Sequence, residues 1–160
     1  MSDQELDKAA RALLDLCRSK GLKLATAESC TGGLVAGALT EIAGSSDVVE
    51  RGFVTYSNAA KETMLGVPAS TLERHGAVSR ETAQAMAKGA LAHAPVDLAV
   101  SITGVAGPGG GTAAKPVGLV HFAAAARDGR LDHREMHYGD IGRAEVRRRS
   151  VLQALSLIHI

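Results

Sequence analysis

Residues 96–118 read VDLAVSITGVAGPGGGTAAKPVG. The largely apolar run Val96–Thr103 predicts a strand buried in the middle of a sheet. Five glycines between residues 104 and 111 then mark an exposed loop. Lys115-Pro116-Val117 leads on to another strand, so the loop is neither a Walker A sequence nor a Rossmann fingerprint opening a helix. A loop this rich in glycine exposes many backbone N–H groups, which can hold a phosphate or a carboxylate, although a plain flexible turn remains the alternative.

Helical and strand patterns alternate on both sides of this segment. Apolar residues recur at intervals of three and four in Asp3–Ser19 and in Thr31–Ala43, which predicts amphipathic helices. Further strands are expected at Leu22–Thr26, Val48–Ser57, Val117–Ala126 and Arg130–Tyr138, the last pair joined at the turn dipeptide Asp128-Gly129. Further helices are expected from a cap at Asn58 through Leu65, between Pro68 and Gly76, from Ser79 to His93, and over Ile141–Leu157 after a cap at Asp140.

This alternation predicts the α/β class, as a three-layer sandwich with a mostly parallel central sheet and helices on both faces. The chain of 160 residues is expected to form one domain, residues 1–160. Its composition is that of a folded protein, with 46% hydrophobic and 22% charged residues. The formal net charge of +1 and the four scattered aromatic residues argue against a nucleic-acid-binding surface.

The cysteines and histidines form no metal-ligand spacing, so we expect no metal and no cofactor. The longest uncharged runs, Ser29–Thr40 and Leu98–Ala114, are too short or too rich in glycine to span a bilayer. Met1–Lys8 is polar and acidic and does not resemble a signal peptide. We therefore expect a cytoplasmic protein with no membrane or nucleic-acid partner. A small alanine-rich domain with an exposed sheet edge also favours a homodimer or a higher homo-oligomer.

Three segments whose side chains or backbone N–H groups could take part in catalysis or binding follow predicted strands. They are residues 28–33, Tyr56–Lys61 and Gly104–Lys115. In open α/β sheets, ligands bind beyond the carboxyl ends of the strands, often at helix N-termini. We therefore expect these three segments to meet at one edge of the sheet.

The first segment places Ser29 at a strand-to-helix turn. Its hydroxyl could attack a substrate, or it could simply cap the helix, which is the commoner role of such a serine. The N–H groups of Cys30, Thr31 and Gly32 are expected to be free to hold an oxyanion, and Gly32 and Gly33 would let a ligand approach the backbone. Cys30 is an alternative nucleophile, because helix N-termini lower thiol pKa values.

The second segment offers Tyr56, Asn58 and Lys61. A lysine beside a serine can act as its base if burial lowers the lysine pKa. The ordinary alternative is a tyrosine at a strand end and a solvated lysine on a helix. In the last predicted helix, Arg143 could reach a phosphate at the same edge, whereas Arg147–Arg149 is typical of a solvated helix face.

Several of these motifs, in this order and spacing, closely resemble the CinA C-terminal domain family, whose stand-alone members are nicotinamide-nucleotide amidases, also called NMN deamidases or PncC proteins. The matching segments are TAESCTGG at 26–33, YSN at 56–58 with Lys61, GVAGP at 104–108, GGT at 110–112 and KPVG at 115–118. The resemblance extends from about Leu6 to Leu155. Near the last helix, Asp140 and Arg143 are similar to the family's Gly-Asp-Arg region. The tail 156–160 departs from the family pattern and suggests a non-native end.

The resemblance implies hydrolysis of nicotinamide mononucleotide to nicotinate mononucleotide and ammonia, without a metal. Ser29 matches the nucleophile, Lys61 the general base and Tyr56 the third catalytic residue. The residues expected to bind the nucleotide are Cys30, Thr31, Gly32, Gly33, Asn58, Gly104, Gly107, Gly110, Gly111, Thr112 and Arg143. Two alternatives remain at this point: a thiol amidase that uses Cys30, and a non-catalytic nucleotide-binding or regulatory module.

Overall fold

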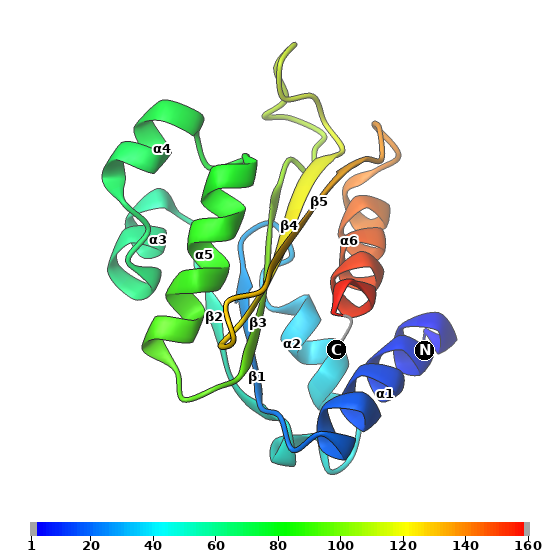
Figure 1. Ribbon diagram of the computed structural model, residues 1–160. Coiled ribbons are helices and arrows are strands. Elements are labelled where there is room, and N and C mark those ends of the chain that lie inside the picture. The colour runs from blue at the N-terminus through cyan, green and yellow to red at the C-terminus, as the bar shows by residue number, and fades with distance from the viewer. Residues whose placement is uncertain (1–2, 159–160) are drawn as a thin grey trace.

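The computed structural model describes residues 3–158 (Figure 1). At its centre lies a five-stranded sheet in the order β2-β1-β3-β4-β5. The strands are β1 (Leu24–Glu28), β2 (Val49–Val54), β3 (Leu98–Gly104), β4 (Leu119–Ala126) and β5 (Leu131–His137). The predicted central strand is therefore confirmed, because β3 has two strands on each side.

Four of the five strands point the same way. β1 pairs in parallel with both β2 and β3. β4 runs antiparallel to β3, and β5 runs antiparallel to β4, which returns β5 to the direction of β3. The mostly parallel sheet is confirmed, and the hairpin expected at Asp128-Gly129 supplies its one reversed strand and its edge.

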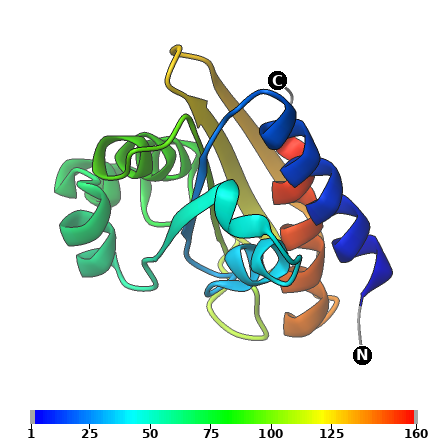
Figure 2. The same cartoon turned by 90° about the horizontal axis from the view of Figure 1, so that it is seen from below.

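Helices cover both faces of the sheet, as the alternating pattern predicts (Figures 1 and 2). On one face lie α1 (Gln4–Ser19), α2 (Leu34–Thr40) and α6 (Arg143–Leu157), and on the other lie α3 (Asn58–Leu65), α4 (Ala69–His75) and α5 (Arg80–His93). A short 3-10 helix, Ser45–Asp47, precedes β2. Alternate residues of β3 point to opposite faces: Val100 and Ile102 pack with the first helical layer, and Ala99 packs with the second.

The structure shifts several predicted boundaries. β1 ends at Glu28 instead of Thr26, and α2 begins at Leu34 instead of Thr31. The later start has a conformational cause, because Gly32 and Gly33 have φ of +57° and +105°, outside the right-handed helical region. Residues 30–33 therefore form a turn between strand and helix.

Two predicted caps are wrong by one and two positions. Ser57, not Asn58, caps α3, and its hydroxyl accepts a hydrogen bond from the Ala60 N–H at 3.0 Å. α6 begins after Gly142 instead of after Asp140, and the Gly142 cap makes no side-chain bond.

The tail 156–160 is described only in part. Ser156 and Leu157 belong to α6, and Leu157 and Ile158 are buried in the main core. Residues 159–160 lie outside the described residues, so the non-native origin of the tail stays a prediction. Among residues 3–158, the structure contains no helix that is both long enough and apolar enough to cross a membrane.

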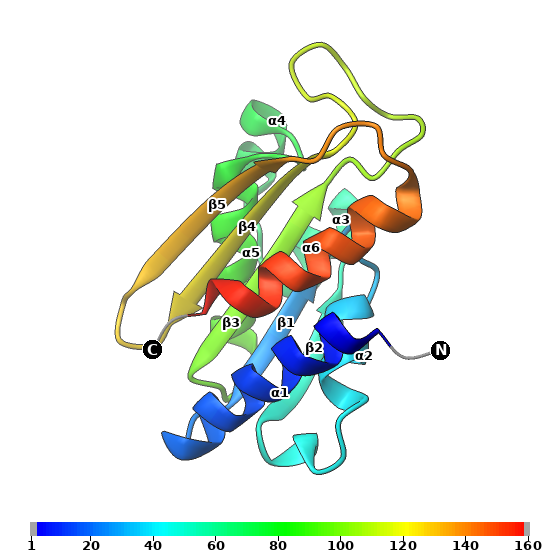
Figure 3. The same cartoon turned by 90° about the vertical axis from the view of Figure 1, so that its right-hand side faces the viewer.

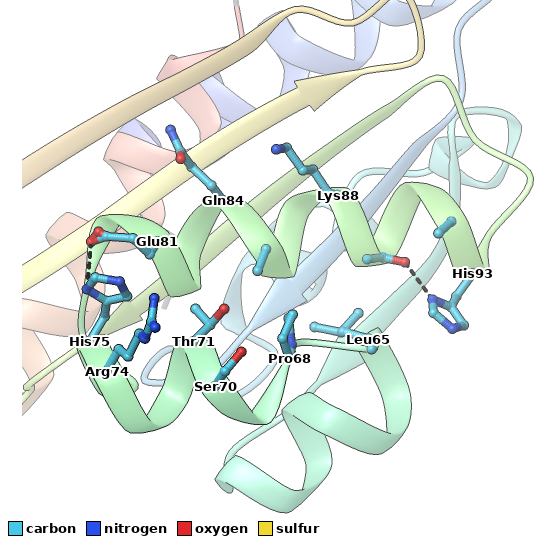
Figure 4. A pocket seen from close by; sticks show the side chains of 14 residues that line it. Leu65, Pro68, Ser70, Thr71, Arg74, His75, Glu81, Gln84, Lys88 and His93 are labelled. Atoms are coloured by element: carbon cyan, nitrogen blue, oxygen red, sulfur yellow. Dashed lines mark hydrogen bonds and ion pairs between the residues drawn. The ribbon is translucent and has the colours of Figure 1, made fainter.

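The contact between α3 and α5 depends on Gly89. A Cβ built at Gly89 would lie 2.0 Å from the Leu65 carbonyl oxygen at the end of α3. This part of α3 lies directly against α5 (Figure 4). The same helix carries Lys61 on its buried face, beside Leu65.

We expect Gly89→Ala to lower the free energy of unfolding by about 3 kcal/mol, since the added methyl group must displace backbone. Gly37→Ala is the matched control: Gly37 lies in α2 with open space around its Cβ position, and alanine should stabilise that helix by roughly 0.5–1 kcal/mol. Urea denaturation of both variants measures the difference. Equal stability of the two variants would contradict the close contact.

Candidate active site

The three segments expected at one edge of the sheet do meet there, and they enclose a cavity of about 300 Å³. The glycine-rich loop and the first turn of α6 lie at this same end of the sheet (Figure 3). The convergence follows from strand direction, because parallel neighbours bring their carboxyl ends to one edge. The cavity is lined by Ser29, Cys30, Tyr56, Lys61, Ala77, Val78, Thr103, Gly104, Val105, Ala106, Gly107, Gly109, Gly110 and Arg143.

Ser29 and Lys61 contact each other inside this cavity. Lys61 Nζ donates to Ser29 Oγ at 3.0 Å and to the Thr55 carbonyl at 2.8 Å. Lys61 is 1% exposed and Ser29 is 8% exposed. Lys61 and Leu65 form the buried face of α3 at a helical spacing of four, so the packing of this short helix directs the lysine inward. The solvated-lysine alternative is therefore wrong.

Burial lowers the pKa of Lys61 from its ordinary value of 10.5, because desolvation disfavours the ammonium form. Its two hydrogen-bond partners, a hydroxyl and a carbonyl, carry no net charge. The site therefore holds an amine that loses its proton more readily than a lysine in water and that touches a serine hydroxyl.

Cys30 also lines the cavity but is not an activated thiol. It is 6% exposed, and burial raises its pKa to about 12. A thiol nucleophile needs a lowered pKa to supply thiolate near neutral pH. The electrostatics at this position therefore disfavour the thiol alternative.

The turn after Ser29 is organised by Glu28, which the sequence reasoning missed. The Glu28 carboxylate is fully buried and accepts from the Thr31 hydroxyl at 2.6 Å and from the N–H groups of Val35 and Ala36 at 2.9 and 3.1 Å. It thus caps α2 from the strand side. The capping role considered for Ser29 is wrong, and its hydroxyl is left to Lys61. An acidic residue at a strand end just before a helix is the signal that could have indicated this cap.

Tyr56 and Arg143 meet across the mouth of the cavity. Arg143 Nη2 donates to the Tyr56 hydroxyl at 2.8 Å, and its Nη1 donates to the Gly107 carbonyl at 2.9 Å. Tyr56 lines the cavity and is 62% exposed, so it lies where the cavity meets solvent. Arg143 therefore links the end of β2, the glycine-rich loop and α6.

Eight of the fourteen site residues expected from the sequence line the cavity, and six do not. Thr31 turns its hydroxyl to Glu28, Asn58 is exposed on α3, and Thr112 accepts from the Lys115 N–H within its own loop at 3.0 Å. The other three residues outside the lining are Gly32, Gly33 and Gly111. In addition, the Gly32 N–H is not free, because it donates to the Ser29 carbonyl at 3.0 Å.

Ala77 and Val78 are lining residues that the sequence reasoning missed. They come from the connection between α4 and α5, and only the packing of these helices brings them to the cavity. Their side chains carry no reactive group, so no sequence signal distinguishes them from ordinary core residues.

A larger hollow of about 580 Å³ lies between α4 and α5 (Figure 4). Its polar groups are partly paired with one another: His75 faces Glu81 at 3.6 Å, and His93 Nδ1 lies 2.8 Å from the Gly89 carbonyl. It contains no serine–lysine pair of the kind seen beside Ser29. Among residues 3–158, no group of three or more His, Cys, Asp or Glu residues is arranged to hold a metal ion. The cavity at Ser29 is therefore the candidate active site because of its serine–lysine contact, although the other hollow is larger.

Comparison with known proteins gives consistent matches over nearly the whole chain. The family model described as the CinA C-terminal domain matches residues 6–160. The nicotinamide-nucleotide amidohydrolase PncC of Escherichia coli K12 is 50% identical over 159 residues, which cover 99% of this chain and 95% of that protein. A crystal structure of the competence/damage inducible protein CihA from Agrobacterium tumefaciens superposes with a TM-score of 0.96 at 57% identity, covering 98% of this chain and 95% of that one.

Other relatives are much longer. A CinA-like protein of Synechococcus sp. RCC307 is 52% identical over 155 residues, which are 96% of this chain but 37% of that protein. The same unit therefore occurs both as almost an entire protein and as about a third of a longer one. The family match, the sequence identity and the superposition agree: this chain belongs to the CinA C-terminal domain family.

Proposed function

We propose that this chain is a serine amidase that hydrolyses the carboxamide of nicotinamide mononucleotide to nicotinate mononucleotide and ammonia. The observation that carries the proposal is the buried contact of 3.0 Å between Ser29 Oγ and Lys61 Nζ in the cavity beside the glycine-rich loop. The name of the half-identical relative from Escherichia coli, a nicotinamide-nucleotide amidohydrolase, supports the substrate.

In the first half-reaction, neutral Lys61 takes the Ser29 hydroxyl proton while Ser29 Oγ attacks the carboxamide carbon. A tetrahedral intermediate forms, and its oxygen becomes negatively charged. Collapse of this intermediate breaks the C–N bond, and the nitrogen leaves as ammonia with the proton returned from Lys61 or relayed through Tyr56. Water then resolves the ester at Ser29 by the reverse sequence of proton transfers.

Backbone N–H groups near Ser29 are the candidate donors to the oxyanion, each worth roughly 3–4 kcal/mol of transition-state stabilisation. The Gly32 N–H is already used within the turn. The remaining candidates are the N–H groups of Cys30, a residue that lines the cavity, and of Thr31, together with amides of Gly104, at the end of β3, and of Gly107 and Gly110 in the loop. Arg143 uses two of its nitrogens on Tyr56 and Gly107, and its remaining N–H groups can meet the phosphate.

Release of ammonia from nicotinamide mononucleotide is the direct test. Purified protein is incubated with the mononucleotide, with free nicotinamide, with glutamine and with nicotinamide adenine dinucleotide, and ammonia is measured by a coupled assay. The proposal expects turnover of the mononucleotide well above that of the other amides. Equal rates with all of them would contradict the substrate assignment.

The second candidate is a nucleotide-binding or regulatory module without turnover. It is favoured by the longer relatives, in which the matching unit is about a third of the protein. Binding of the mononucleotide, measured by calorimetry, with no ammonia release would support this candidate instead.

We further propose that the protein is cytoplasmic and forms a homo-oligomer. Cell fractionation tests the location, and light scattering tests the oligomeric state.

Tyr56→Phe tests the third catalytic residue. The change removes the hydroxyl that accepts from Arg143 and keeps the ring in the cavity mouth. If that hydroxyl relays the leaving-group proton, kcat should fall by about 10²-fold with little change in KM. Steady-state kinetics measure both constants. An unchanged kcat would show that Tyr56 forms only a wall of the cavity.

A further inference from the structure

Arg147 lies behind the turn that carries Ser29. Its Nε donates to the Cys30 carbonyl at 3.1 Å, and its Nη2 donates to the Thr31 carbonyl at 3.4 Å. The side chain is half-buried, although the sequence pattern predicted a solvated helix face for Arg147–Arg149. That prediction is wrong for Arg147 and also for Arg148, which is half-buried and pairs with Asp3 and Glu5. It holds for Arg149, which is exposed and pairs with Glu145 on its own helix.

Within the turn, the Gly32 N–H donates to the Ser29 carbonyl and the Leu34 N–H donates to the Thr31 carbonyl, each at 3.0 Å. Gly32 and Gly33 occupy left-handed conformations, and the helix that follows has only seven residues. Its N-cap residue, Gly33, has no side chain to cap the helix, and the Glu28 carboxylate supplies the cap instead. Glycine is the residue with the largest conformational freedom, so a turn with two of them has many alternatives to the observed geometry.

Two charged side chains stabilise the turn, one by accepting hydrogen bonds and the other by donating them. Glu28 accepts from donors of the turn and helix, including the Thr31 hydroxyl. Arg147 donates to acceptors, the carbonyls of Cys30 and Thr31. Thr31 is therefore bound at both ends: its hydroxyl donates to Glu28, and its backbone carbonyl accepts from Arg147. A planar guanidinium can serve two neighbouring carbonyls at once, which a lysine ammonium does less well.

Arg143 and Arg147 are one helical turn apart on α6 but have different surroundings. Arg143 lines the cavity, whereas Arg147 does not. A Cβ at Gly32 would lie 3.3 Å from Arg147 Nη2, so the guanidinium packs closely against the turn. Arg147 thus reaches the reacting atoms only through the backbone that follows Ser29.

We propose that Arg147 is a positioning residue for Ser29: its bonds to the Cys30 and Thr31 carbonyls fix the peptide groups after the serine and hold its hydroxyl at Lys61. The proposal rests on the amidase function proposed above. It gives α6 a second role at the site, beside that of Arg143, although Arg147 and Cys30 are more than one hundred residues apart in sequence.

The test compares Arg147→Met with Arg149→Met. The first removes both donors to the turn and keeps an apolar stem; the second removes an exposed arginine from the same helix. We expect Arg147→Met to lower kcat for ammonia release by about 10²-fold, as for a small misplacement of a nucleophile, with KM within threefold of wild type. Arg149→Met should leave both constants unchanged. Thermal melts monitor folding of each variant.

A third variant, Arg147→Lys, keeps the charge and should lose less kcat than Arg147→Met, because it can hold one carbonyl at a time. If Arg147→Met fails to fold, this variant decides the question: a reduced kcat at unchanged melting temperature supports positioning, and full activity overturns it. A kcat of Arg147→Met within twofold of wild type also overturns it, as does an equal loss in Arg149→Met.

The outcome is separable from that of the proposed function. Wild-type turnover of the mononucleotide tests the function, and the ratios between variants test the positioning. If wild type releases no ammonia, the same variants are compared by the rate at which phenylmethanesulfonyl fluoride labels Ser29, followed by intact mass. Slower labelling in Arg147→Met than in Arg149→Met supports the proposal, and equal rates overturn it.

Discussion

Ser29→Ala is expected to abolish ammonia release from nicotinamide mononucleotide, with a fall in kcat of at least about 10⁴-fold. The variant removes the only atom that the proposed mechanism joins covalently to substrate. It removes little volume, and Lys61 keeps its bond to the Thr55 carbonyl, so the fold should remain intact. Nucleotide binding, measured by calorimetry, should therefore stay close to that of wild type.

Ser70→Ala is the matched control, because Ser70 is an exposed serine on α4 that lines the other hollow and not the cavity at Ser29. It should retain full activity.

Cys30→Ala distinguishes the two candidate nucleophiles. With a thiol pKa of about 12, Cys30 should resist iodoacetamide at neutral pH, and its alanine variant should remain active. An active Ser29→Ala together with an inactive Cys30→Ala would instead establish the thiol mechanism.

Lys61→Met is expected to lose activity nearly as completely as Ser29→Ala, because no other side-chain nitrogen contacts the Ser29 hydroxyl among the described residues. Lys61→Arg should be inactive as well, since a guanidinium is not a base near neutral pH. Retained activity in either variant would exclude Lys61 as the base. Circular dichroism confirms that the loss is chemical and not a loss of fold.

The pH dependence of the wild type follows from the lowered pKa of Lys61. The base is competent only when it is neutral, so kcat/KM should rise with pH, with a midpoint below the ordinary lysine value of 10.5. A rise centred at or above 10.5 would contradict the burial effect. The profile is measured with the mononucleotide over a range in which the protein stays folded.

Stability should respond to the same pKa. Between the lowered folded-state pKa and 10.5, the unfolded state binds more protons at Lys61 than the folded state does. The free energy of unfolding of the wild type therefore gains a positive slope with pH in that window. Lys61→Met lacks this contribution, so any stability advantage of the variant should shrink as pH approaches 10.5. Urea denaturation at several pH values measures the difference.

Many features of this protein depend on local sequence patterns, and these features could be predicted from the sequence. The periodicity of Asp3–Ser19 and the apolar run before the glycine-rich loop predict a helix and a central strand, because side-chain spacing decides which face is buried. Strand direction then brings the ends of β1, β2 and β3 to one edge. The motifs at Ser29, Tyr56 and Lys61 indicate the chemistry before any contact is known.

The tertiary structure decided which of these groups meet and in what state. The sequence does not show whether a lysine on a short helix is solvated or buried. Only the packing of α3 against α5 places Lys61 beside Ser29, where it is 1% exposed. Likewise, Arg147 belongs to a run that is typical of a solvated surface, yet it donates to the turn at Cys30. Desolvation and contacts between distant residues depend on the whole fold, and a local pattern contains no information about them.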